Sequence, residues 1–265
     1  MTALLRRDVM AGAAAVSVGA AAPAPAEAPD PCAIVELRQY RMKPGRRGDL
    51  AELFDREFVE TQEAVGTTVI GQFLDLDRPD RYVWMRGFPD MAARARSLEA
   101  FYGGPIWKAH RESANATIDD SDDVLLLHPV GPAFRPQRTR APLGTPRPAG
   151  LVVAEIHYPK AGAEAAFAAL FAATVAPAMA AGGAELVGTF ASEHSPNSFP
   201  RLPVREGERA FVALSRFAGP LTHDRYRLKL ATRAWRDGPA AEMAALSDRR
   251  SEMLRLAPTP RSALR

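Results

Sequence analysis

Val69-Ile70-Gly71-Gln72-Phe73 recurs 117 residues later as Leu186-Val187-Gly188-Thr189-Phe190, so the chain of 265 residues repeats itself. Tyr82–Phe88 likewise parallels Phe211–Phe217, now at an offset of 129, which requires one insertion within Ser192–Glu208. Ordered agreement of this kind is the mark of an internal duplication. The helical apolar positions also match at the first offset: Leu50, Leu53, Phe54 and Phe58 fall on Phe167, Leu170, Phe171 and Val175.

Each half has the pattern of a ferredoxin-like βαββαβ unit. In the first half, branched and aromatic residues predict strands over 34–42, 67–76, 82–88 and 124–130, and helical spacing predicts helices near 50–58 and over 91–115. A ferredoxin-like sheet carries helices on one face only, so its other face must be buried against a partner. We therefore predict an α+β fold in which two tandem repeats pair face to face as an intrachain α/β barrel.

The predicted organisation has four parts. Residues 1–26 are an export signal, 33–130 the first repeat, 131–150 a linker rich in proline and arginine, and 151–258 the second repeat. The export signal rests on Arg6-Arg7 followed by an Ala-rich stretch and Ala24-Pro25-Ala26, which is similar to a bacterial twin-arginine signal. It predicts a periplasmic or secreted protein. No run approaches the ~18 apolar residues of a membrane span, so no span is expected.

The charge distribution argues against a nucleic-acid partner. The chain is net +3, but residues 1–26 carry +1, residues 131–150 carry +4 and residues 257–265 carry +2, which leaves the remainder at −4. A basic binding face is therefore absent from the predicted repeats. The single cysteine, Cys32, excludes an intramolecular disulfide, and the sequence has no nucleotide-binding or metal-ligand motif, so no cofactor or metal is expected.

The first half resembles a NIPSNAP domain. The resemblance rests on Val35–Tyr40 leading to Lys43-Pro44-Gly45, the glycine within Val69–Phe73, the aromatic strand Tyr82–Phe88 and Pro105-Ile106-Trp107. The second half keeps four matching residues, Glu155, Gly188, Phe190 and Trp235, but has His157-Tyr158-Pro159 in place of Arg-x-Tyr. The resemblance spans residues 33–258 and implies a dimeric α/β-barrel fold related to cofactor-independent oxygenases. It implies no reaction.

Strand alternation sorts the candidate site residues by face. We predict that Val35 and Leu37 face the helices, as do Val152, Ala154 and Ile156 in the second half. The opposite faces would then bring polar and aromatic side chains together inside the barrel: Glu36, Arg38, Tyr40, Trp84, Arg86, Glu155 and His157.

Three functions remain open on this pattern. The first is binding of a small apolar or anionic molecule in the barrel interior, with Glu36, Tyr40, Trp84, Arg86 and Glu155 as its contacts. The second is a cofactor-independent oxygenase or isomerase with His157 as base and Arg38 as oxyanion partner. The third is a structural or interaction protein in which the same charged residues are interior pairs. A filled interior with saturated carboxylates would favour the third, and the sequence leaves a homo-oligomer open.

Overall fold

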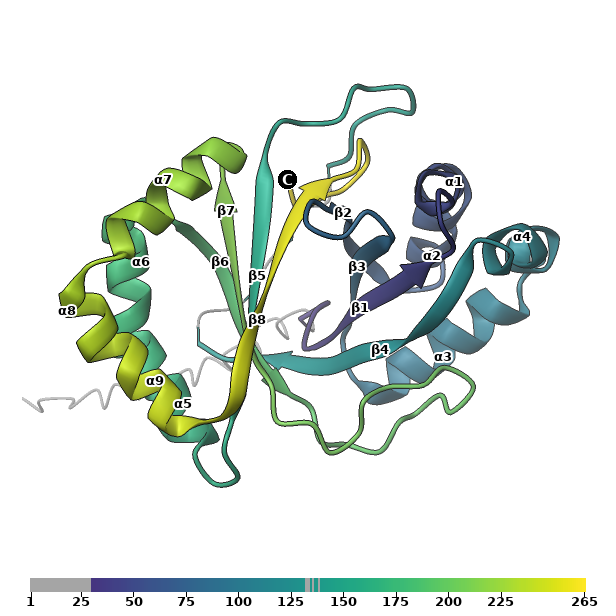
Figure 1. Cartoon of the computed structure of the whole chain (residues 1–265). Helices are drawn as coiled ribbons and strands as arrows, with labels where there is room; N and C mark the ends of the chain where they lie inside the picture. Colours follow the sequence, from purple (N-terminus) through teal and green to yellow (C-terminus); the bar gives the residue numbers. More distant parts are fainter. Residues whose placement is uncertain (1–29, 132–133, 135, 138) are drawn as a thin grey trace, which may run out of the picture.

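Eight antiparallel strands form a closed barrel in the order β1-β3-β2-β8-β5-β7-β6-β4 (Figure 1). The structure is a computed structural model and describes residues 30–131, 134, 136–137 and 139–265; the predicted export signal lies outside them. The strands are β1 (Ile34–Met42), β2 (Thr68–Asp75), β3 (Arg81–Phe88), β4 (Ile118–Pro129), β5 (Leu151–Pro159), β6 (Glu185–Ser192), β7 (Phe211–Phe217) and β8 (Ser247–Pro258).

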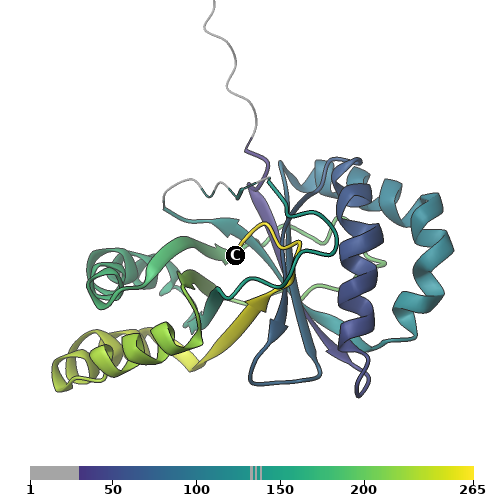
Figure 2. The same ribbon diagram turned by 90° about the horizontal axis from the view of Figure 1, so that it is seen from above.

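Helices cover the outside of the barrel on two opposite sides (Figures 1 and 2). Those of the first half are α1 (Arg47–Leu53), η1 (Phe54–Phe58), α2 (Val59–Glu63), α3 (Met91–Gly103) and α4 (Pro105–Asn115). Those of the second half are α5 (Glu164–Leu170), η2 (Phe171–Val175), α6 (Ala176–Gly182), α7 (Pro220–Leu230), α8 (Arg233–Trp235), η3 (Arg236–Ala240) and α9 (Ala241–Leu246).

The two halves join at two equivalent seams. Phe73–Asp75 of β2 pairs with Leu256–Pro258 of β8, and Leu127–Pro129 of β4 pairs with Phe190–Ser192 of β6. These ranges correspond to each other at the two sequence offsets, so the barrel has an internal two-fold relation. The prediction of two ferredoxin-like repeats that close one barrel within one chain is confirmed.

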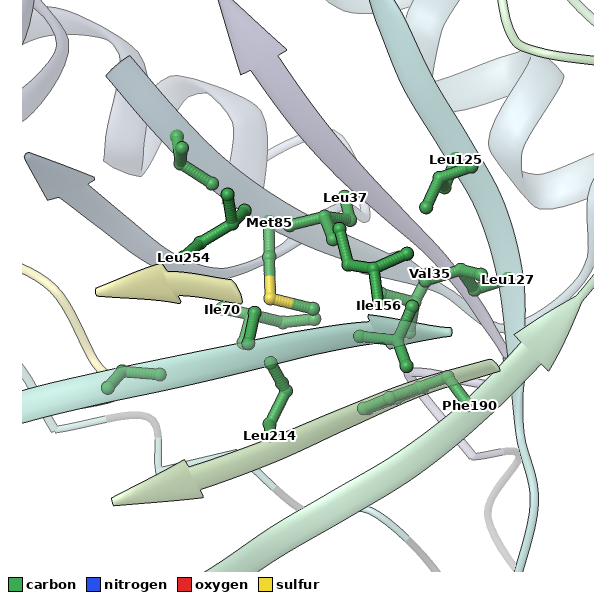
Figure 3. Packing of buried hydrophobic residues seen from close by; sticks show 14 of the residues in the cluster. Val35, Leu37, Ile70, Met85, Leu125, Leu127, Ile156, Phe190, Leu214 and Leu254 are labelled. Carbon is green, nitrogen blue, oxygen red and sulfur yellow. The ribbon is translucent and has the colours of Figure 1, made fainter. Parts of the chain in front are cut away.

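The barrel interior is filled with apolar side chains (Figure 3). Val35 and Leu37 of β1 pack there against Ile156 and Leu214 from the other half. The predicted assignment of strand faces is therefore wrong: Val35, Leu37, Val152, Ala154 and Ile156 point into the barrel instead of toward the helices. Apolar residues from both sheets fill the space between them.

Two segments beyond the repeat pattern complete the barrel. After β8 the chain folds back along β2, where the Leu264 amide donates to the Ile70 carbonyl at 2.9 Å. After β4, Phe134 packs on Phe190 with ring centroids 5.1 Å apart. The linker is also held to both the first half and the C-terminal segment, because Arg140 donates to Glu63 at 2.5 Å and to the Arg261 carbonyl at 2.9 Å.

The helix formed by α5, η2 and α6 is predominantly apolar. Residues Glu164–Gly182 are long and apolar enough, at mean hydropathy 1.7, to cross a membrane by length and composition. The prediction that no run reaches this length is therefore wrong. Four of its side chains lie buried in the core cluster that includes β5 and β7: Phe167, Phe171, Val175 and Met179. This is the burial expected of a helix that covers a sheet.

Candidate functional site

The predicted site residues lie in two separate places, both between a sheet and its helices. Tyr40 and Trp84 belong to the apolar cluster under α1–α4, whereas His157 contacts Phe167 of α5 at 5.2 Å between ring centroids. The prediction that these side chains converge inside the barrel is therefore wrong. The first-half group and the second-half group lie outside the barrel wall, on opposite sides of the molecule.

Glu36 is the centre of a buried ion-pair network in the first half. Its Oε2 accepts from Arg38 Nη1 and Arg86 Nε, each at 2.8 Å, and its Oε1 accepts from Arg94 Nε at 2.6 Å. All four side chains are fully buried. Gln62 extends the network, since its Oε1 accepts from Arg86 Nη1 at 3.0 Å. One carboxylate thus balances three guanidinium groups.

The surplus positive charge determines the electrostatics of this region. Burial alone would raise the pKa of Glu36, but Arg86, Arg38 and Arg94 outweigh burial and hold that pKa well below its usual range. The Nη2 atoms of the three arginines are buried without a hydrogen-bond partner among the described residues. Aromatic rings lie beside two of these arginines: Arg86 Cζ is 4.8 Å from the Trp84 ring centroid, and Arg38 Cζ is 5.5 Å from that of Tyr40.

Local sequence explains how α3 brings Arg94 to the sheet. The Asp90 carboxylate accepts from the Ala93 amide at 2.6 Å and starts the helix, which places Arg94 in its first turn. Gly104 then adopts an extended conformation and Pro105 begins α4, so the helix predicted over 91–115 is two helices. The resulting helical hairpin brings Tyr102 and Trp107 into contact, with ring centroids 4.8 Å apart.

A cavity of about 380 Å³ lies above this network, between the first sheet and its helices. Tyr40 and Trp84 line it from the sheet, Phe54 and Phe58 from η1, and Trp107 from α4. The lining holds no Asp or Glu. It includes two arginines, Arg111 and Arg201, and a further set of mostly apolar residues: Leu50, Gln62, Phe101, Tyr102, Ala114, Asn115, Ile118, Ser121, Phe199 and Leu202.

The second half contributes part of this first-half cavity. The connection between β6 and β7 spans residues 193–210 and contains the predicted insertion; in Figure 1 it is the green loop that reaches toward α3 and β4. Phe199 from this loop stacks on Tyr102 at 5.9 Å with an interplanar angle of 24°. Arg94 Nη1 donates to Asn197 Oδ1 at 3.0 Å and to Ser198 Oγ at 3.1 Å. The loop is therefore tied to the Glu36 network.

The equivalent cavity in the second half is smaller and is lined by different residues. A cavity of about 250 Å³ there is lined by Glu155, Tyr226 and Trp235 among others. His157 Nε2 lies 3.7 Å from Glu155 Oε2, too far for a hydrogen bond. By strand register Glu155 occupies the position of Arg38, whereas Val153 occupies that of Glu36. The sequence match of Glu155 with Glu36 is therefore wrong by two residues.

One larger hollow, of about 480 Å³, lies over α1 and is bounded by the linker and the C-terminal segment. Its buried carboxylate, Asp55, already accepts from Thr259 Oγ1 at 3.0 Å and from the Arg261 amide at 3.3 Å. In the described part of the chain, no group of three or more His, Cys, Asp or Glu side chains could hold a metal ion. The first-half cavity is thus the better candidate site.

Sequence reasoning missed Arg94, Arg111, Phe199 and Arg201. Arg94 and Arg111 lie on helices whose arginines are mostly solvent-facing, so composition does not distinguish them. Phe199 and Arg201 lie within the insertion that the repeat comparison located. That insertion was a usable signal, because extra residues in one copy of a duplication often carry what the other copy lacks.

Residues 35–130 match the NIPSNAP family. This NIPSNAP half is the one that holds the Glu36 network and the larger of the two sheet–helix cavities. No curated protein matches the chain.

Three solved structures place the fold in context. A proposed monooxygenase from Lactobacillus acidophilus NCFM is 12% identical, with a TM-score of 0.54 over 87% of this chain and 96% of its own. An anthrone oxidase-like protein is 11% identical, with a TM-score of 0.54 over 85% and 91%. A NIPSNAP family protein from Agrobacterium tumefaciens is 24% identical and aligns over 37% of this chain and 92% of its own, with a TM-score of 0.34. The first two share the whole duplicated barrel, beyond the NIPSNAP half.

Proposed function

We propose that the NIPSNAP half binds a small aromatic molecule in the cavity between its sheet and helices. A volume of about 380 Å³ lies within the range of about 300–1,000 Å³ that is usual for small-molecule pockets. Rings from strand, helix and loop line it, and Phe54 and Trp84 already meet edge to face at 4.8 Å between centroids. Such walls favour a flat apolar ligand. The proposal moves the expected ligand from the barrel interior, which is filled, to this cavity.

Tyr40 supplies the polar contact on the cavity floor. Its hydroxyl oxygen accepts from Arg38 Nε at 3.0 Å, so its own proton is free to be donated to a ligand oxygen. The guanidinium behind it strengthens that donor. Arg38 is fully buried and does not line the cavity, so it acts through Tyr40. His157 lies in the other half and has no part in this proposal.

A fluorescence titration tests the proposal. N-phenyl-1-naphthylamine is a neutral aromatic dye that brightens in apolar surroundings, and we expect saturable binding. Trp107→Ala should weaken binding about threefold to tenfold, the loss of one aromatic contact. Trp235→Ala, which alters the second-half cavity, should leave the affinity unchanged. Absence of saturable binding to the unaltered protein, or equal effects of the two variants, would reject this cavity as the binding site.

A second candidate is cofactor-independent oxygenation or isomerisation of the bound molecule. The shared fold with proposed monooxygenases favours it, and Tyr40 could hydrogen-bond an enolate oxygen. The assay is oxygen consumption with dithranol, an anthrone, as substrate. A rate that equals the protein-free rate, or one that is unaffected by Tyr40→Phe, excludes oxygenation of this substrate class by the proposed route.

The Glu36 network itself supports the structural alternative for Glu36, Arg38 and Arg86. These residues pair with one another and are fully buried, and through Arg94 they connect the sheet to α3 and to the loop over residues 193–210. We propose that they shape the cavity without touching the ligand.

A further inference from the structure

The cavity of the NIPSNAP half has a surplus of positive charge at its mouth as well as beneath its floor. Arg111 of α4 and Arg201 of the 193–210 loop line it, and no carboxylate does. Arg111 is exposed, and it makes no hydrogen bond or ion pair with any residue that the structure describes. Beneath the floor, three guanidinium groups face one carboxylate. Charges of one sign around a low-dielectric cavity favour a ligand of the opposite sign.

Arg201 is held in a defined place although it is exposed. Its guanidinium carbon lies 4.7 Å from the ring centroid of Phe199, which in turn stacks on Tyr102. Glu99 of α3 pairs with Arg201 Nη2 at 2.5 Å, but both side chains are about two-thirds exposed at 64% and 68%. An ion pair so exposed to water is weak. A ligand anion at the mouth can therefore share Arg201 or replace Glu99.

The second half supplies Arg201 through its insertion. The first-half connection at the equivalent place covers only residues 76–80, so the second half has no matching loop over its own, smaller cavity. Arg205 Nη1, which lies 3.1 Å from Asp123 Oδ1, fastens the far end of the loop to β4 of the NIPSNAP half. The loop is thus anchored at two points on the half that it covers.

We infer that the ligand is an aromatic anion, with its rings among Tyr102, Phe199 and Trp107 and its acidic group between Arg201 and Arg111. The inference rests on the proposed function and narrows it to the ligand class of carboxylates, sulfonates and phenolates. It also gives the second half a role in recognition, because the loop of that half carries the residue that selects for charge.

A matched pair of dyes tests this inference. 8-Anilinonaphthalene-1-sulfonate has the ring system of N-phenyl-1-naphthylamine plus one sulfonate, so the two differ mainly in charge. We expect the anionic dye to bind more tightly. Arg201→Gln and Arg111→Gln should each lower the affinity for the anionic dye by up to about fivefold, which is the effect of losing one exposed ion pair. The affinity for the neutral dye should stay unchanged. Added salt should reduce the difference in affinity between the two dyes, because it screens the charge of the sulfonate and of the arginines.

The control is Arg227→Gln, which removes an arginine from the second-half cavity and should change neither dye. Equal affinity of the unaltered protein for both dyes would overturn the charge selection, as would loss of both dyes together in Arg201→Gln. In either case, retained binding of the neutral dye would leave the proposed function standing. Failure of both dyes to bind would overturn the proposed function and this inference with it.

Discussion

The two halves share a strand register but differ in their buried polar groups. In the NIPSNAP half Glu36 lies opposite Arg86, whereas the equivalent pair in the second half is Val153 opposite Ser215. Arg94 of α3 likewise corresponds to His223 of α7 at the second sequence offset, and each is fully buried. The second half therefore covers its own sheet without the charged network found in the first.

This difference separates what the fold requires from what the site requires. A ferredoxin-like half closes over its sheet without a charged network, as the second half does around Phe167, Phe171 and Phe211. The Glu36 network is thus not a condition of folding in this architecture. It occurs in the half that has the larger sheet–helix cavity, where Arg94 also fixes the loop from the other half. The comparison indicates that the network shapes the cavity.

The largest expected effect is on stability, from removal of the central carboxylate. Glu36→Gln leaves three buried guanidinium groups without a counter-charge and should lower the free energy of unfolding by about 3–5 kcal/mol. Urea denaturation at pH 7 measures it. The matched variant is Glu155→Gln, which removes a carboxylate two residues from the register position of Glu36 in the second half. The Glu155 side chain is 20% exposed, and its Oε2 lies 3.7 Å from His157 Nε2.

Glu155→Gln should therefore cost less than about 1 kcal/mol. Equal losses in the two variants would mean that the halves do not differ in their dependence on a buried carboxylate, and the proposed contrast between network and apolar packing would be wrong.

An intermediate effect is expected from the repeated glycine. A Cβ on Gly71 would lie 2.4 Å from Phe73 Cζ and 2.8 Å from Ser262 Oγ, whereas a Cβ on Gly188 would come no closer than 3.0 Å, to Phe134 Cδ2. Gly71→Ala should therefore cost about 1–3 kcal/mol, as overpacking does, and Gly188→Ala less. The midpoints of thermal unfolding compare them. A larger loss for Gly188→Ala would contradict the closer packing of the C-terminal segment on β2.

The fold was accessible from the sequence because duplication leaves a pattern that survives weak identity. The offsets of 117 and 129 also relate the residues at the two seams, where Phe73 corresponds to Phe190 and Leu127 to Leu256. A sheet with one bare face needs a partner, and a second copy in the same chain supplies it. These two facts were enough to predict the closed barrel.

The candidate site was placed on the wrong side of the sheet for a physical reason. The alternation of residues along a strand separates its two sides but does not show which side is exposed to water. In this protein both sides are buried. Val35 and Leu37 face the opposite sheet, while Tyr40 and Met42 face helices, so both sets are buried. Arg38 and Arg86 lie on the helix-covered side, where both pair with Glu36. Arg201 could not be assigned to the site from the sequence, because it lies in the second half whereas the cavity that it lines belongs to the first.

The smallest expected effect distinguishes the halves by their response to acid. His223 is fully buried, and burial together with Arg255 and Arg227 lowers its pKa. Neither ring nitrogen has a hydrogen-bond partner among the described residues. The folded protein therefore holds this histidine neutral to a lower pH than the unfolded chain, which takes up a proton near pH ~6.5. Its contribution to stability is present above that pH and is lost as the pH falls, by at most about 1.4 kcal/mol per pH unit.

Glu36 acts in the same direction but at lower pH, because its pKa is also lowered from a starting value near 4.3. Between pH 7.5 and 5.5 the loss of stability should thus come from the second half, and His223→Phe should reduce it. His194→Gln, at an exposed position, is the matched control. The measurement is urea denaturation at both pH values. If the pH dependence of stability were unchanged in His223→Phe, the buried histidine of the second half would not be the cause of the sensitivity to mild acid. The two halves would then differ in their buried polar groups only through the Glu36 network.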